Sequence, residues 1–332
     1  MKKTVQLAGR EVRRVGFGCM NVSHAYGNRP TEAEAIALLH AAIDAGYDHL
    51  DTAALYGAGN NERLLGQSVM ARRDEYLLAS KCGMLSTPEG KVIDGQPSSL
   101  RRDCENSLRN LGVEHIDLYY LHRWDRAVPI AESVGELARL KQEGKIGHIG
   151  LSEVSAQTLR AAHAEHPITA LQSEYSLLTR NLEIAALNAC RELGVVVVAF
   201  SPNGRALLSD NPPQLEALAK GDMRLSQPRY QPEHFARNEH LRLQLAGYAA
   251  QLSVSVSQIA QAWLLHKDEH LVVLPGTTSQ HHMRDNLASL DIELSPDLVA
   301  ALDELYAPER ISGAPRGEAT RHECDTESFP GQ

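Results

Sequence analysis

The sequence predicts a closed (β/α)8 barrel, in which eight parallel strands form the core and helices surround them. Short segments rich in β-branched and aliphatic residues alternate with amphipathic segments from about residue 15 to residue 290. Such alternation implies parallel strands joined by helical crossovers. No linker divides the 332-residue chain into halves. One closed barrel domain over residues 1–332 is therefore favoured over an open sheet or two domains.

The expected strands are eight short apolar segments, at residues 15–17, 49–51, 76–79, 117–121, 146–151, 170–172, 195–200 and 271–274. The expected helices lie between and after them, at residues 31–45, 98–111, 130–143, 155–165, 181–193 and 238–267. In the second of these, Leu100, Cys104 and Leu108 repeat at helical spacing. Ser99 and Gly112 stand where an N-cap and a C-cap are expected.

Three further segments lie outside this repeat. Residues 4–14 alternate weakly around a Gly and predict a hairpin that plugs the bottom of the barrel. Residues 201–237 form a long loop after the seventh strand, and residues 308–332 a polar tail. Loops of this length are usually functional or disordered. The tail either folds over the pocket or extends freely.

The composition narrows the class of protein. Hydrophobic residues make up 43% and charged residues 23%, which is ordinary for a globular chain. The net charge of −9, without a dense basic block, argues against nucleic-acid and anionic-membrane partners. No apolar run is long enough to span a membrane. Five scattered cysteines without a C-x-x-C pair predict free thiols and a cytoplasmic location.

Four chemically compatible side chains follow three consecutive expected strands. Asp51 ends the second strand and Tyr56 follows it, while Lys81 and His122 come after the third and fourth. Active residues of (β/α)8 barrels lie at the carboxyl ends of the strands. We therefore expect these four side chains to meet at one mouth of the barrel.

This combination suits protonation of an oxygen while hydride reaches the adjacent carbon. A phenol has a pKa of about 10, and a nearby ammonium such as that of Lys81 lowers it. Asp51 supplies the counter-charge that a buried Lys81 needs. His122 is placed to orient a carbonyl oxygen or relay the proton. Because no side chain carries hydride, a nicotinamide or flavin is implied.

The residues at these strand ends resemble those of the aldo-keto reductases over nearly the whole chain. The resemblance is carried by Val15–Gly18, Asp51–Ala53, Tyr56–Gly57, Asn61–Gly66, Lys81–Gly83, Asp117–His122, Gly147–Ser152, Phe200–Pro202 and Pro275–Thr277. Gln172–Leu177 and the loop at 223–235 resemble the bacterial, plant and yeast branch that includes potassium-channel β-subunits. The resemblance implies that Tyr56 is the general acid/base, that Lys81 and Asp51 tune it, and that His122 orients the carbonyl.

The resemblance also implies contacts to a nicotinamide dinucleotide. The positions that hold the carboxamide are Ser152, Glu153 and Gln172. Phe200 is the aromatic residue beneath the nicotinamide ring. The pyrophosphate cradle is formed by Ser201, Pro202, Asn203 and Gly204. The adenosine end is formed by Gly276, Thr277, Thr278, Ser279, His282, Asp285 and Asn286.

The chain departs from the family pattern at several of these positions. Glu153 replaces a common Asn, Phe200 a common Tyr and Asn203 a common Leu. The Lys and Arg that usually follow the Pro-Gly-Thr are missing, so the bidentate Arg that favours NADP is not in its place. Hydroxyls, two His and a helix N-terminus remain to bind a 2′-phosphate. NADP(H) is the favoured cofactor, and NAD(H) is the alternative.

The expected activity is hydride transfer between NADP(H) and a small carbonyl or alcohol substrate. Met20 and Trp124 are expected to line the substrate pocket, although a merely packed loop Trp fits equally well. An NAD-linked sugar or alcohol dehydrogenase is the first alternative. A cofactor-binding regulator like the channel β-subunits is the second. No metal site is expected, and no feature of the sequence indicates an oligomeric state.

Overall fold

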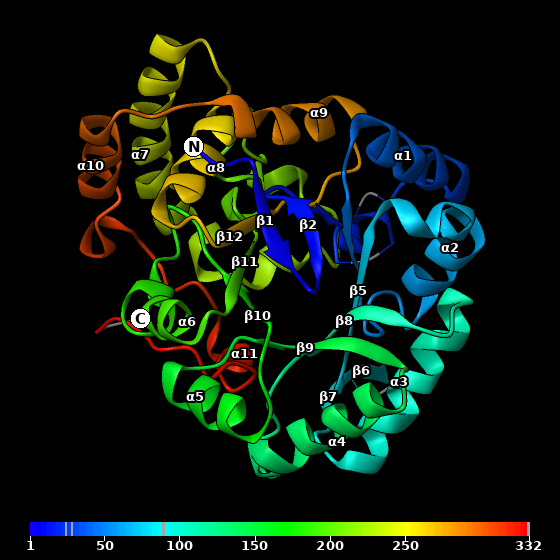
Figure 1. The fold of residues 1–332 in the computed structure, drawn as a ribbon. Coiled ribbons are helices and arrows are strands. Elements are labelled where there is room, and N and C mark those ends of the chain that lie inside the picture. Colours follow the sequence, from blue (N-terminus) through cyan, green and yellow to red (C-terminus); the bar gives the residue numbers. More distant parts are fainter. Residues whose placement is uncertain (24, 28, 88–89, 331–332) are drawn as a thin grey trace.

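The computed structural model describes residues 1–23, 25–27, 29–87 and 90–330. Eight parallel strands form one sheet in the order β12-β11-β10-β9-β8-β5-β4-β3. A parallel bridge between Val15 and Val273 joins the two ends of this sheet. The Gly16 N–H donates to the Val273 carbonyl at 2.9 Å, and the Gly18 N–H to Pro275 at 3.0 Å. The barrel is thus closed, as the sequence predicted (Figure 1).

All eight expected strand segments contribute to the barrel. The strands are β3 (Phe17–Gly18), β4 (His49–Asp51), β5 (Leu77–Cys82), β8 (Ile116–Leu121), β9 (Ile146–Ser152), β10 (Ala170–Glu174), β11 (Val196–Phe200) and β12 (Leu271–Leu274). Several of them run past the apolar segment that predicted them. Lys81, beyond the expected segment 76–79, therefore lies on β5, which fixes its direction more firmly than a loop would.

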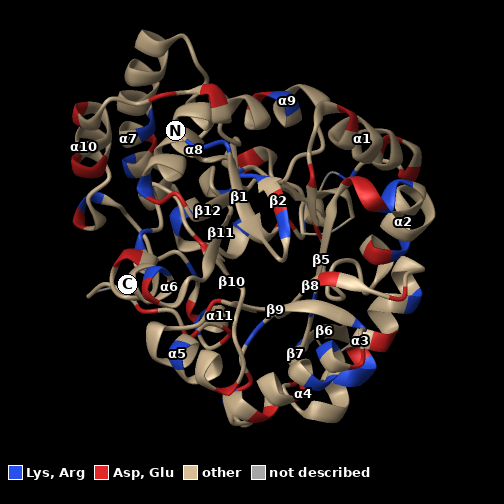
Figure 2. Ribbon diagram, in the orientation of Figure 1, with Lys and Arg blue, Asp and Glu red and all other residues tan. Residues whose placement is uncertain are grey.

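The helices surround the barrel (Figure 1). They are α1 (Glu32–Ala45), α2 (Asn60–Ser68), α3 (Pro97–Leu111), α4 (Ile130–Gln142), α5 (Ala156–Glu165), α6 (Ala186–Leu193), α7 (Pro232–Leu252), α8 (Val256–Lys267), α9 (Gln280–Ala288), α10 (Pro296–Leu305) and the short α11 (Glu318–Arg321). Lys and Arg lie among Asp and Glu on the outer helices (Figure 2). This mixture of signs is typical of a solvated surface.

The helix boundaries correct two expectations. Residues 238–267 form parts of two helices, because Ser253 adopts a left-handed φ of 55° and Ser255 then caps α8. The helix α3 begins at Pro97 with Gln96 as its N-cap, and the Ser99 hydroxyl instead donates to Asp94 at 2.6 Å. Gly112 ends α3 with a φ of 68°, as predicted. Glycine suits this left-handed conformation because it has no Cβ.

Two antiparallel hairpins accompany the barrel. The first, β1 (Thr4–Leu7) and β2 (Arg10–Arg13), closes the bottom as predicted. Its buried residues, including Leu7 and Val12, pack against side chains inside the barrel. Functional residues are thereby confined to the opposite mouth. The second hairpin, β6 (Met84–Thr87) and β7 (Gly90–Ile93), follows β5 and was not predicted from the sequence.

Candidate active site

A cavity of about 710 Å³ opens at the carboxyl ends of the barrel strands. The strand ends contribute lining residues in turn around the rim, namely Asp51 from β4, His122 after β8, Ser152 from β9, Gln172 from β10, Phe200 from β11 and Leu274 from β12. The long loop after β11 and the C-terminal tail supply further walls. This is the position at which barrels of this type hold their active sites.

Three of the four expected catalytic side chains form one buried cluster. The Lys81 ammonium donates to a carboxylate oxygen of Asp51, to the Thr52 carbonyl at 2.8 Å and to the Tyr56 hydroxyl at 3.4 Å. Gln172 donates its side-chain amide to the other Asp51 oxygen at 2.8 Å. Both charges of the ion pair are buried, with exposed fractions of 0% for Lys81 and 2% for Asp51. The Tyr56 hydroxyl is thus hydrogen-bonded to a buried ion pair.

His122 faces the same phenol. The ring centroids of Tyr56 and His122 are 6.0 Å apart, and the two rings are nearly perpendicular at 86°. Both residues line the cavity. The four side chains named from the sequence therefore gather at one end of the cavity. A carbonyl oxygen at this point would lie within reach of a phenol and an imidazole.

The turn after β4 holds the phenol in position. Gly57, Ala58 and Gly59 have left-handed φ values of 59°, 53° and 83°. Such a run is strained for residues with a Cβ and indicates a turn held by its surroundings. The Thr52 hydroxyl donates to Asn61 at 2.6 Å, and the Asn61 amide donates to the Cys19 carbonyl at 2.8 Å. These polar residues support Tyr56 and were not predicted as part of the site.

The electrostatic balance at Tyr56 differs in sign from the sequence-based argument. Burial raises the pKa of Tyr56, and the opposing effect of the Lys81 ammonium does not cancel this. For Lys81, burial alone would lower the pKa, but Asp51 and Tyr56 together hold it above its ordinary value. At neutral pH the phenol is therefore protonated and the amine charged. This state suits a proton donor.

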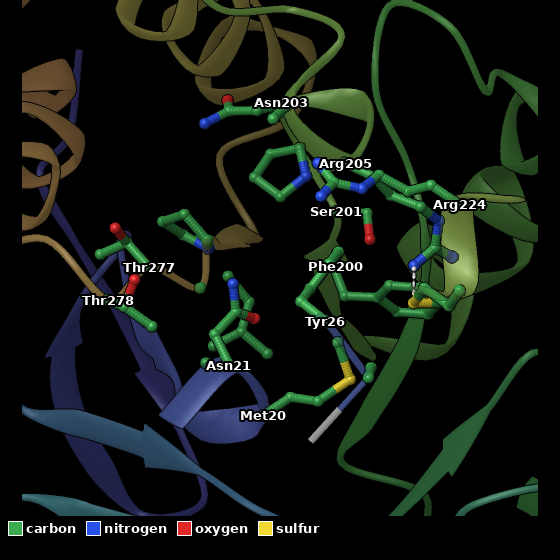
Figure 3. A pocket seen from close by; sticks show the side chains of 18 of the residues that line it. Met20, Asn21, Tyr26, Phe200, Ser201, Asn203, Arg205, Arg224, Thr277 and Thr278 are labelled. Carbon is green, nitrogen blue, oxygen red and sulfur yellow. Dashed lines mark hydrogen bonds between the residues drawn. The ribbon is translucent and has the colours of Figure 1, made fainter. Parts of the chain in front are cut away.

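Most of the expected cofactor contacts lie along the cavity. Those that line it are Ser152, Gln172, Phe200, Ser201, Pro202, Asn203, Gly276, Thr277, Thr278, His282, Asp285 and Asn286. In Figure 3, Thr277 and Thr278 lie across an open space from Ser201 and Asn203. A Cβ at Gly276 would stand 2.6 Å from the Asn21 side chain. The segment after β3, which contains Asn21, and the segment after β12 can approach this closely because residue 276 is a glycine.

Two expected contacts face away from the cavity. A Cβ at Gly204 would stand 2.6 Å from Leu178, which shows that this glycine packs against the protein. The Ser279 hydroxyl caps α9 by accepting from the His282 N–H at 3.3 Å. The backbone around Gly204 is nevertheless unusual, because Ser201 and Arg205 have left-handed φ values of 52° and 56°. Such turns expose backbone N–H groups that can bind anions.

Glu153 also turns away from the cavity, contrary to expectation. Its carboxylate accepts from the Glu174 N–H at 2.6 Å and from the Thr326 hydroxyl at 3.1 Å, and it pairs with Arg316 at 2.9 Å. Glu153 therefore anchors the C-terminal tail and is not among the residues that line the cavity. The replacement of Asn by Glu is explained by this ion pair with Arg316.

The tail folds over one side of the cavity. Asp325 accepts from the hydroxyls of Ser155 and Thr158 at 2.8 and 2.7 Å, which fixes the tail to the start of α5. Arg316 and Glu323 line the cavity. Of the two possibilities raised by the sequence, the folded tail is the one observed.

We expect Arg316→Met to release the tail. Removal of the guanidinium leaves the Glu153 carboxylate buried without its cation, and breaking a buried pair in this way costs about 3–5 kcal/mol. Because the tail is terminal, we expect local release, seen as faster amide hydrogen exchange over residues 312–328. Arg126→Ala is the matched control, since that side chain also contacts the tail but is 56% exposed. Equal exchange in both variants would contradict the anchoring role.

Trp124 and Met20 differ in their relation to the cavity. Trp124 is not among the lining residues. Its indole N–H donates to the Val128 carbonyl at 2.9 Å, and its ring packs against the main core. Met20 lines the cavity, as expected. Of the two roles that the sequence left open for Trp124, the packed loop residue is therefore the one observed.

The long loop crosses the cavity mouth to the segment after β3. The Met223 N–H donates to the Ala25 carbonyl at 3.1 Å, and the Arg224 guanidinium lies 5.0 Å from the centre of the Tyr26 ring. Figure 3 shows Arg224 and Tyr26 side by side. Neither residue was singled out from the sequence. The arginine and proline content of the loop was the only signal of its role.

The family is decided by residues 14–307, which match the model of the aldo/keto reductase family. The chain belongs to the aldo/keto reductase family. This match spans the barrel from its first strand to the end of α10. The family identifies the chain as an NAD(P)-dependent oxidoreductase.

Among the described residues, no group of three or more His, Cys, Asp or Glu could hold a metal ion. In the same part of the chain, no helix is long and apolar enough to cross a membrane.

Solved structures of this family resemble the chain over nearly its full length. A glycerol dehydrogenase from Gluconobacter oxydans is 24% identical with a TM-score of 0.84, covering 99% of this chain and 98% of its own, which shows a shared fold. An aldo-keto reductase from Bacillus halodurans in a holo form is 26% identical with a TM-score of 0.76, over 93% and 97%. One from Klebsiella pneumoniae, in complex with NADP and acetate, is 28% identical with a TM-score of 0.72, over 93% and 96%.

Proposed function

We propose that this aldo-keto reductase catalyses hydride transfer between a nicotinamide cofactor and a small aldehyde, ketone or sugar, with Tyr56 as the general acid/base. The observation that carries this proposal is the buried Asp51–Lys81 pair in contact with the Tyr56 hydroxyl at the end of a large cavity. No structural role requires an ion pair, a phenol and an imidazole at one cavity wall. The cytoplasmic location stays a prediction.

The cofactor would occupy the part of the cavity that runs from Ser152 and Phe200 to Thr277 and His282. Its nicotinamide supplies or accepts the hydride when bound. Ser152 and the side-chain oxygen of Gln172 would hold the carboxamide, because the Gln172 nitrogen already donates to Asp51. Phe200 would stack beneath the ring, since stacking needs only an aromatic face. The turn at 201–206 would receive the pyrophosphate.

The protein's own residues would handle the proton. His122 would donate a hydrogen bond to the substrate carbonyl and turn it toward Tyr56. Tyr56 would give its proton to this oxygen as negative charge develops there. The ion pair with Asp51 keeps Lys81 charged. The positive charge of Lys81 would stabilise the Tyr56 phenolate left behind. For alcohol oxidation, the same residues act in reverse.

NADP(H) is the proposed cofactor, because the Klebsiella pneumoniae relatives were solved with NADP and with NADPH. NAD(H) is the alternative. Thr277, Thr278 and His282 line the cavity, whereas no Lys or Arg from residues 276–286, the segment expected to hold the adenosine, lines it. A phosphate here would be bound by hydroxyls and an imidazole.

We expect His282→Arg to tighten NADPH binding by roughly tenfold, because it adds a charge-assisted hydrogen bond to the 2′-phosphate. The affinity for NADH, which lacks that phosphate, should change little. Fluorescence titration of both cofactors measures this. The matched control is His281→Arg, since His281 is largely exposed and lies outside the cavity lining. A parallel change for both cofactors would contradict the assignment of this end of the cavity.

The activity itself is tested by following NADPH consumption with a panel of aldehydes and ketones, together with product analysis. Formation of one alcohol per NADPH consumed supports the proposal. Tight cofactor binding without turnover of any carbonyl or alcohol would instead favour a regulator of the channel β-subunit kind. Turnover only with NAD⁺ and alcohols would favour the NAD-linked dehydrogenase.

A further inference from the structure

Arg123 is a buried cation at the catalytic end of the cavity. It directly follows His122 at the end of β8, lines the cavity and is only 8% exposed. Its Nη1 donates to the His122 carbonyl and, at 3.1 Å, to the Ser152 hydroxyl. The guanidinium therefore spans the ends of β8 and β9, beside the residues expected to hold the substrate carbonyl.

Arg123 differs from the other cations of the cavity wall in having no carboxylate partner. The other four are each paired, namely Lys91 with Glu323 at 3.7 Å, Arg205 with Glu174 at 2.8 Å, Arg224 with Asp222 at 2.7 Å and Arg316 with Glu153 at 2.9 Å. Within the described parts of the chain, no carboxylate lies within 4.0 Å of Arg123. Its Nε is buried and has no hydrogen-bond partner there.

An unpaired, buried guanidinium is energetically unfavourable, so its retention at a cavity wall calls for an anion from outside the protein. Both protein contacts of Arg123 use Nη1. Nε is buried and out of reach of the cavity, so Nη2 is the nitrogen left to donate a charge-assisted hydrogen bond to a carboxylate there. The permanent charge of Arg favours a carboxylate over a neutral group.

We infer that Arg123 determines substrate specificity by binding a carboxylate carried by the substrate, so that the preferred substrates are carbonyl compounds with an anionic group. This inference rests on the proposed function and deepens it. Because Arg123 is the chain neighbour of His122, a carboxylate bound there fixes the substrate beside the residue that orients its carbonyl. The carboxylates of Glu153 and Asp51 do not compete, since Glu153 is bound to Arg316 and Asp51 to Lys81.

Paired substrates test the inference. We would compare kcat/KM for para-carboxybenzaldehyde and para-tolualdehyde, and for succinic semialdehyde and butanal. A charge-assisted pair contributes roughly tenfold to hundredfold. We expect the native chain to favour at least one carboxylated member of a pair by this factor. In Arg123→Gln the ratio should fall to about one, and Arg123→Lys should retain part of it. Arg224→Gln is the matched control and should keep the native ratio, because Arg224 is a cavity cation with its own carboxylate.

A binding measurement keeps the test independent of turnover. We would titrate the NADP⁺-loaded protein with benzoate and with benzamide, and expect tighter benzoate binding that Arg123→Gln abolishes. Equal affinities in the native chain, or an unchanged preference in Arg123→Gln, would overturn the inference. If NADPH affinity weakens in Arg123→Gln while the ratio of kcat/KM between paired substrates stays the same, Arg123 binds the cofactor. This result would also overturn the inference. Reduction of neutral carbonyls alone would refute this inference and leave the proposed function intact.

Discussion

Replacement of Tyr56 by Phe should reduce carbonyl turnover by roughly two to four orders of magnitude, the usual contribution of a positioned general acid. The substitution removes the hydroxyl that contacts Lys81 at 3.4 Å and keeps the ring that faces His122. NADPH affinity should therefore be nearly unchanged. Steady-state kinetics and a cofactor titration on the same preparation measure both effects. Full activity in Tyr56→Phe would refute the assignment of the acid.

The pH dependence of the native enzyme provides an independent readout of the same residue. Reduction needs the protonated phenol, and burial raises the pKa of Tyr56. The kcat/KM for reduction should therefore be flat through neutral pH and fall only as the pH rises through this raised pKa. Oxidation needs the phenolate, so its kcat/KM should increase with pH over the neutral range. Both dependences should disappear from the residual activity of Tyr56→Phe.

Replacement of Asp51 by Asn should be strongly destabilising, by about 3–5 kcal/mol, because it leaves the Lys81 ammonium buried without its counter-charge. The two groups are almost fully buried, so water cannot compensate. Denaturant unfolding should show a lower midpoint with an unchanged m-value. The control is Asp44→Asn, since Asp44 is 67% exposed and its pair with Arg72 should contribute no more than about 1 kcal/mol. Equal losses in both variants would contradict the account.

A double variant separates stability from catalysis at this pair. Asp51→Leu combined with Lys81→Met replaces both charges by apolar groups, a change that is often neutral or stabilising for buried pairs. We expect the double variant to recover much of the stability lost in Asp51→Asn. It should remain inactive, because the phenolate of Tyr56 then has no adjacent cation. Recovery of activity together with stability would show that the pair is purely structural.

The barrel and the meeting of the catalytic side chains could be predicted because both depend on local patterns. Apolar runs alternating with amphipathic segments identify parallel strands, and the carboxyl ends of parallel strands meet at one rim. Asp51 and Lys81 were therefore expected to be neighbours although 30 residues separate them. The break at Ser253 was missed because a left-handed φ at a serine has no strong sequence signal.

The directions of individual side chains at the rim depend on distant partners. Glu153 turns from the cavity because Arg316 and Thr326, far along the chain, bind its carboxylate. Trp124 packs against the core and donates its indole N–H to the Val128 carbonyl. Arg123 went unnoticed because its lack of a partner is visible only once the pairs of the other cavity cations are known. The pKa of Tyr56 likewise depends on the depth of burial, which the order of residues does not specify.

If the cavity is a nicotinamide site serving Tyr56, titration of the purified protein with NADPH should show saturable binding of one NADPH per chain. Its affinity should be at least tenfold above that for NADH under the same salt conditions, a difference of about 1.4 kcal/mol. Failure of both NADPH and NADH to bind would show that the cavity does not hold a nicotinamide cofactor.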